Sequence, residues 1–120
     1  MYENLILYRN ELKNKNIPKY KIIGIIVELI FSKEIFKSNK EIGIFLKEVF
    51  NIEFKNYVMK SRTMIVSRVC KKILDDANIN YKNRLIEFIN KQIDVLKNSN
   101  DIKEKRNEFD GWINKIWVMI

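Results

Sequence analysis

The chain has 120 residues, with 23 lysines and arginines against 15 acidic residues, no histidine and one cysteine. This length predicts a single domain over 1–120, and the net charge of +8 favours an anionic partner. Without histidine, Ser-His and Cys-His nucleophiles are excluded, and the lone Cys70 excludes an internal disulfide.

The amino-terminal residues 2–15 have the pattern of an amphipathic helix. Its apolar stripe consists of Leu5, Tyr8 and Leu12. A turn follows over 14–18, and Pro18 suits the first position of the next helix. The chain starts at Met1 with a mixed polar and apolar stretch, which does not have the pattern of a signal peptide. Together with the single cysteine, this predicts a reducing, cytoplasmic location.

Residues 19–37 contain the most apolar run of the chain, IIGIIVELIF. The β-branched residues would also allow a buried strand, but no partner strand is visible elsewhere, so we expect a central buried helix. Charged residues interrupt the run at Lys21, Glu28 and Lys33. The run is therefore too short and too interrupted to cross a bilayer, and no membrane partner is expected.

A capping box opens the next expected helix, with Ser38 as N-cap and Glu41 three residues later. We expect this helix to run to about Phe50. Its buried residues would be Ile42, Phe45 or Leu46, and Val49. Asn51 and Ile52 end it.

The following stretch, 54–74, contains no acidic residue. Its six cations are Lys55, Lys60, Arg62, Arg68, Lys71 and Lys72. They account for +6 of the net charge of +8, which leaves +2 for the other 99 residues. This local pattern points to an anionic ligand more directly than the overall charge does.

Wound as a helix, this stretch has an apolar face and a polar face. The apolar face contains Phe54, Val58, Ile65 and Val69, and the polar face contains Asn56, Lys60, Thr63, Ser67 and Lys71. Such a row of donors suits phosphate oxygens and base edges. Arg62 falls among the apolar positions, so it must extend to solvent, find a buried partner, or mark a break with Ser61 as N-cap of a helix over 62–74. The alternative for the whole stretch is a core helix with a solvated lysine face.

The region 38–74 resembles a loose helix-turn-helix. Glu41-Ile42-Gly43 is similar to the start of a first helix, Asn51-Ile52 to the turn, and TMIVSR from Thr63 to Arg68 to the start of a recognition helix. Two features depart from that pattern. The first helix is about one turn too long, and about ten residues separate Ile52 from Thr63.

After a break at 75–78, a helix is expected from Asn80, and another ends the chain. The former carries Leu85, Ile89, Ile93 and Leu96 at near-heptad spacing. A second break at 98–101 precedes the last helix. That helix has a continuous apolar stripe: Phe109, Trp112, Ile113, Ile116, Trp117 and Ile120. Trp112 and Trp117 either dock into the protein's own core or anchor a partner protein. The fold expected is all-α, a compact bundle of about five helices.

Catalytic and metal-binding patterns are mostly missing. Glu53-Phe54-Lys55 has the acid-x-lysine spacing of some nucleases, but no aspartate precedes it within twenty residues. Asp75-Asp76 more simply ends a helix. We therefore expect no enzyme activity, no cofactor and no metal.

Three functional hypotheses follow. The first is a small nucleic-acid-binding protein that contacts phosphates through the helix at about 54–74. Its candidate residues are Lys55, Asn56, Lys60, Arg62, Thr63, Ser67, Arg68, Lys71 and Lys72. Tyr57 and Tyr81 could stack on bases or lie at the edge of the core, and the choice between DNA and RNA stays open.

The second hypothesis is a scaffold subunit of a larger nucleoprotein assembly. Small basic helical subunits occur in CRISPR effector complexes, and this chain is similar to them in size, helix content and charge alone. In that case Trp112 and Trp117 would contact the assembly. The third hypothesis is a protein-binding regulator or inhibitor whose basic face meets an acidic partner.

Overall fold

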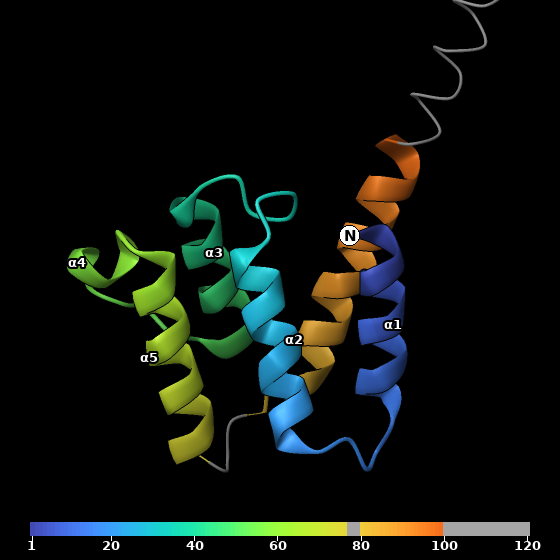
Figure 1. Cartoon of the computed structure of the whole chain (residues 1–120), viewed down its shortest axis with the longest axis horizontal. Helices are drawn as coiled ribbons and strands as arrows, with labels where there is room; N and C mark the ends of the chain where they lie inside the picture. Colours follow the sequence, from blue (N-terminus) through green and yellow to red (C-terminus); the bar gives the residue numbers. More distant parts are fainter. Residues whose placement is uncertain (77–79, 100–120) are drawn as a thin grey trace, which may run out of the picture.

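A computed structural model describes residues 1–76 and 80–99 of the chain (Figure 1). These residues form six helices and no strand, which confirms the expected all-α fold. The helices are α1 (Tyr2–Lys13), α2 (Lys19–Phe31), α3 (Asn39–Phe50), α4 (Asn56–Met59), α5 (Arg62–Asp75) and an unlabelled helix over 82–99. The predicted last helix, with Trp112 and Trp117, lies outside the described residues.

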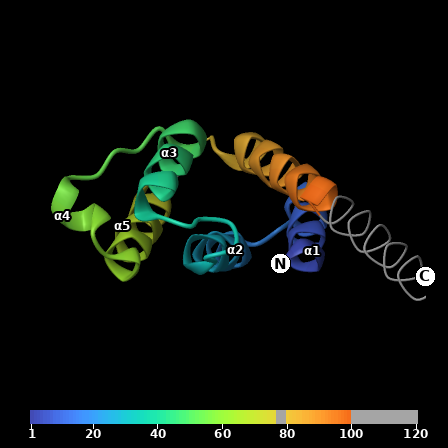
Figure 2. The same cartoon turned by 90° about the horizontal axis from the view of Figure 1, so that it is seen from above.

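The helices are arranged around α2 (Figure 2). In both views α4 and α5 lie on one side of α2 and α1 lies on the other. Figure 2 shows that the 82–99 helix starts beside α3 and runs toward α1. Such an arrangement requires α2 to be largely apolar. It buries Ile22, Ile25, Ile26, Leu29 and Ile30. The expected central buried helix is therefore confirmed.

Two boundaries of α2 differ from the prediction. Pro18 is the N-cap, with φ −71° and ψ 149°, so it precedes the helix by one position. The helix ends at Phe31 and not at residue 37, because Ser32 takes an extended conformation with φ −74° and ψ 115°. The Ser32 hydroxyl then accepts a hydrogen bond of 3.3 Å from the Ile35 amide, which stabilises a turn in place of a further helical turn.

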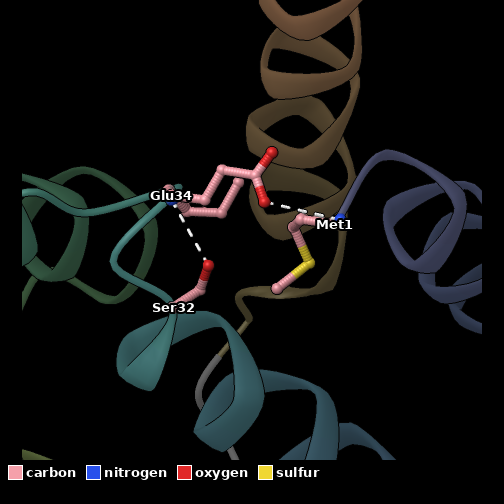
Figure 3. Close-up of polar contacts among 4 residues, drawn as sticks. Met1, Ser32 and Glu34 are labelled. Carbon is pink, nitrogen blue, oxygen red and sulfur yellow. Dashed lines mark hydrogen bonds and ion pairs between the residues drawn. The ribbon is translucent and has the colours of Figure 1, made fainter.

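The loop after α2 also holds the amino terminus (Figure 3). The Met1 amino group lies 3.4 Å from a carboxylate oxygen of Glu34. Further along α1, the side chains of Leu5 and Leu12 are fully buried, as the apolar stripe predicts. Both ends of α1 are thus positioned by contacts with the rest of the fold.

The predicted capping box does not form at the start of α3, because the glutamate reaches one residue beyond the N-cap and the serine makes no capping bond. Glu41 Oε2 accepts a hydrogen bond of 2.7 Å from the Lys37 amide, but Ser38 makes no side-chain capping bond. At the other end Asn51 adopts a left-handed conformation with φ 55°, a geometry that asparagine tolerates better than most residues. The Ile52 amide then donates to the Leu46 carbonyl at 3.2 Å, so the chain leaves α3 in a fixed direction.

The basic stretch is divided into two helices. α4 is a single turn, and α5 begins at Arg62 after Ser61, whose hydroxyl accepts a hydrogen bond of 3.4 Å from the Met64 amide. The break at Ser61, one of the options left open for Arg62, is therefore confirmed. α5 packs against α2 and α4, and residues 51–61 separate it from α3, so the connector is longer than the tight turn of a helix-turn-helix.

Aromatic rings join α3 to the loop after α2 and to the 82–99 helix. The ring centroids of Phe45 and Phe88 are 4.5 Å apart, and those of Phe36 and Phe45 are 5.1 Å apart. Arg84 Nε donates a hydrogen bond of 2.8 Å to the Val49 carbonyl, which joins the 82–99 helix to the end of α3. The core therefore runs across elements that are far apart in the sequence. Among the helices described, none is long and apolar enough to span a membrane.

Candidate nucleic-acid interface

A cleft of about 370 Å³ lies between the 53–58 stretch and residues 68–75 of α5. Its charged lining residues are Lys55, Arg68, Lys71, Lys72, Glu53 and Asp75. The first four carry positive charge and are exposed to solvent. We call this hollow the basic cleft. Its lining residues come from the segment before α4, from α4 and from α5, the elements at one end of the ribbon in Figure 1.

The local sequence explains why these residues meet. α5 buries Ile65, Val69 and Ile73, which recur every four residues and so define one face toward the core. α4 buries Val58, and the chain reverses direction at Ser61. The residues that precede α4 therefore lie beside the end of α5, and cations separated by up to 17 positions between Lys55 and Lys72 share one cleft.

None of the four cations of the basic cleft has a carboxylate partner among the described residues. Within residues 1–76 and 80–99 the ion pairs are Met1 with Glu34 and Lys47 with Glu53. The second of these, at 3.3 Å, partly neutralises Glu53 at the edge of the cleft. Four positive charges thus face two carboxylates, one of which is already paired from outside the cleft.

The two carboxylates are residues that the sequence analysis did not assign to the site. Glu53 and Asp75 immediately flank the stretch without acidic residues, one before it and one after it. Folding α4 back along α5 brings both ends of that stretch together, so both acids line the cleft. The flanking positions were visible in the sequence, but their meeting depends on the chain reversal at Ser61.

The predicted polar row of five residues is divided by the same reversal. Thr63, Ser67 and Lys71 remain on one exposed face of α5, since they are spaced by four residues. Asn56 is the first residue of α4 and Lys60 is its C-cap, so both precede the helix break at Ser61. Neither residue lines the basic cleft. Both are exposed. They are therefore peripheral to the cleft.

Arg62 has a different environment from the other predicted contacts. Its guanidinium donates to the carbonyl oxygens of Ile30 at 2.9 Å and Ser32 at 3.4 Å, and also to that of Phe36. All three acceptors belong to the end of α2 and the loop that follows. Two of the three options for Arg62 therefore hold: it follows a helix break at Ser61, and its guanidinium has partners inside the fold. Its donors are used inside the fold, so we remove Arg62 from the set of phosphate contacts.

The two tyrosines considered for stacking are separated by the fold. Tyr57 lines the basic cleft and is 56% exposed. Tyr81 is 8% exposed, its ring centroid lies 5.1 Å from that of Phe50, and burial raises the pKa of its phenol. Tyr57 can reach a ligand, while Tyr81 is part of the core.

The remaining chemistry of the described part is sparse. No group of three or more Cys, Asp or Glu side chains close enough to hold a metal ion occurs there. Cys70 on α5 is partly buried, and that burial raises the pKa of its thiol. No protein-family model, no curated protein and no solved structure matches the chain.

Proposed function

We propose that this protein binds nucleic acid without catalysing a reaction, and that the basic cleft is its contact surface. One observation carries the proposal: a single cleft is lined by four exposed cations that have no carboxylate partner within 1–76 and 80–99. The residues assigned to phosphate contact are Lys55, Arg68, Lys71 and Lys72. Thr63 and Ser67 add hydroxyl groups on the adjoining face of α5.

The physical argument starts from repulsion between like charges. Bringing Lys71, Lys72 and Arg68 together with Lys55 costs electrostatic free energy, which a bound polyanion would offset. Phosphate oxygens accept charge-assisted hydrogen bonds from lysine and arginine, and neutralised phosphates release counterions. A cytoplasmic location, which the single cysteine favours, would place the protein among such polyanions.

A charge-reversal experiment tests this proposal. Lys71→Glu with Lys72→Glu should abolish binding to a fluorescent oligonucleotide, measured by anisotropy at low salt. The matched control is Lys19→Glu with Lys21→Glu, which changes the net charge equally at two exposed positions of α2. Equal losses in both variants would mean that only net charge matters and would overturn the assignment of the cleft. If neither variant loses affinity, the proposed function is wrong.

A place in a larger nucleoprotein assembly is the second candidate. It is favoured by an exposed row on α2, where Tyr20 is 71% exposed and Phe31 is 45% exposed, with Gly24 between them. These three residues share one helical face, and exposed aromatic residues are favoured at protein interfaces. Trp112 and Trp117 remain candidates for the same role.

Affinity purification from source cells separates this candidate from the others. If the protein belongs to a nucleoprotein assembly, partner proteins should copurify with it, and the variant Tyr20→Ser with Phe31→Ser should lose them. Binding of that isolated variant to oligonucleotides should be unchanged. Nuclease treatment provides the control for partners bridged by nucleic acid. If an acidic protein is retained after nuclease treatment and is lost in Lys71→Glu with Lys72→Glu, the protein-binding regulator is favoured instead.

A further inference from the structure

Tyr57 distinguishes the basic cleft from a plain basic surface. It comes from the single turn of α4, where the adjacent Val58 is 3% exposed and anchors that turn in the core. Tyr57 itself is 56% exposed and lines the same cleft as Lys55, Arg68 and Lys71. An aromatic side chain next to several unpaired cations provides both a stacking surface and phosphate contacts.

The shape of the site favours an unpaired strand. Double-stranded DNA is read by an element that protrudes into its major groove, usually the exposed face of a helix. On α5 the cations Arg68, Lys71 and Lys72 lie between the middle of the helix and its carboxyl-terminal end, and they line a recess. The amino-terminal end of α5 is tied to α2 by Arg62. A recess can receive a base that is not paired, whereas a duplex holds its bases inside the stack.

The acidic residues narrow the path of the ligand. Glu53 and Asp75 line the cleft with the cations, and a phosphate placed against either carboxylate would be repelled. Glu53 is partly offset by Lys47. The backbone is therefore expected to follow the cations, while the carboxylates can accept hydrogen bonds from base amino or imino groups or, in RNA, from the 2′-hydroxyl.

From these observations, and resting on the proposed function, we propose that the ligand is single-stranded nucleic acid, with one base stacked on Tyr57 and its neighbouring phosphates held by Lys55, Arg68, Lys71 and Lys72. The stack is tolerant of base identity, because every base has an aromatic face. Four phosphate contacts around one stacked base fit a short site of a few nucleotides.

The experiment compares three ligands of equal length by fluorescence anisotropy at one salt concentration: a single strand, its duplex, and a single strand with abasic sites throughout. The proposal predicts that the single strand binds tightest. Tyr57→Ala should weaken that binding by about 5- to 150-fold, the range for loss of one base stack, while Tyr57→Phe stays close to the unmodified protein. The abasic strand should bind Tyr57→Ala and the unmodified protein equally.

Tyr20→Ala is the matched control, because Tyr20 is an exposed tyrosine on α2, far from the cleft in the sequence, and it should leave the affinity unchanged. Urea unfolding of Tyr57→Ala checks that the fold persists. If that variant is unstable, cross-linking of a 5-iodouracil strand to the unmodified protein provides a second measurement, in which Tyr57 should be the modified tyrosine and Tyr20 should not be.

The outcomes separate the two proposals. Stronger binding to the duplex, or an unchanged affinity in Tyr57→Ala, contradicts single-strand stacking even when Lys71→Glu with Lys72→Glu abolishes binding. In that case the proposed function stands and the stacking is wrong. If the lysine reversals also leave the affinity unchanged, both proposals are wrong.

Discussion

The guanidinium of Arg62, at the first position of α5, donates a hydrogen bond of 2.9 Å to the carbonyl oxygen of Ile30 near the end of α2. The last carbonyls of a helix have no donors within that helix, and a positive charge there also interacts favourably with the helix dipole. The Arg62 guanidinium also donates hydrogen bonds to the carbonyl oxygens of Ser32 and Phe36 in the loop that follows α2. One side chain thus joins the start of the helix that carries the cleft to the end of the central helix.

Loss of this connection should destabilise the protein. Arg62→Ala is expected to lower the free energy of unfolding by about 1.5–3 kcal/mol, because charged hydrogen bonds to backbone carbonyls are lost. Arg62→Lys should recover only part of this, since one ammonium group cannot match the forked guanidinium. Urea unfolding measures the effect, with the exposed Arg68→Ala as control. Equal stabilities of Arg62→Ala and Arg68→Ala would contradict the role given to Arg62.

The two serine N-caps should respond differently to the same substitution. Ser61→Ala removes a side-chain bond to the Met64 amide and should cost about 0.5–1 kcal/mol, at the low end because that bond is 3.4 Å long. Ser38→Ala removes no capping bond and should cost clearly less. Thermal unfolding of both variants under identical conditions tests this. A larger loss in Ser38→Ala would show that the predicted full capping box forms in solution.

The glycines of α2 and α3 provide a second matched pair. A methyl group at Gly24 would meet no atom within 4 Å, so Gly24→Ala should stabilise the protein by up to about 1 kcal/mol. At Gly43 the added carbon would lie 3.3 Å from Met59 Cε, so part of that gain should be lost to crowding between α3 and α4. Denaturant midpoints give the comparison. If Gly43→Ala were the more stable of the two, the close approach of α3 and α4 would be wrong.

Alkaline pH should weaken the fold. Burial raises the pKa of Cys70 above its ordinary value of 9.0 and that of Tyr81 above 10.0. The folded protein therefore keeps these protons to higher pH than the unfolded chain does. Their contribution is fully present below pH 9 and is lost as pH rises through the folded pKa values. The free energy of unfolding should fall above pH 9, and less steeply in Cys70→Ser; an identical slope in that variant would contradict the burial of the thiol.

The sequence predicted those features that depend on local periodicity. The stripe of Leu5, Tyr8 and Leu12, the buried run of α2 and the break at Ser61 each follow from neighbouring residues, and each is confirmed. Local patterns failed where a distant partner decided the outcome. α2 ends at Phe31. The carbonyl oxygens at this end accept hydrogen bonds from Arg62, a residue about thirty positions away in the sequence.

The candidate site follows the same division. Four of the predicted cations line one cleft, because they belong to a stretch free of acids that folds back on itself. A single helical wheel could not place Lys55 next to Lys72, nor could it bring Glu53 and Asp75 into the cleft, because both depend on the reversal at Ser61. Nor could the sequence decide between Tyr57 and Tyr81, because only the packing of Tyr81 against Phe50 distinguishes the buried ring from the exposed one.

The dependence of binding on salt tests the central claim most directly. Contact of four phosphates with Lys55, Arg68, Lys71 and Lys72 predicts a slope of log affinity against log salt of about −2.8 on single strands. Lys71→Ala with Lys72→Ala should reduce its magnitude to about 1.4, because two contacts are removed. A salt-independent affinity, or an unchanged slope in the double variant, would contradict the basic cleft as the surface that binds nucleic acid.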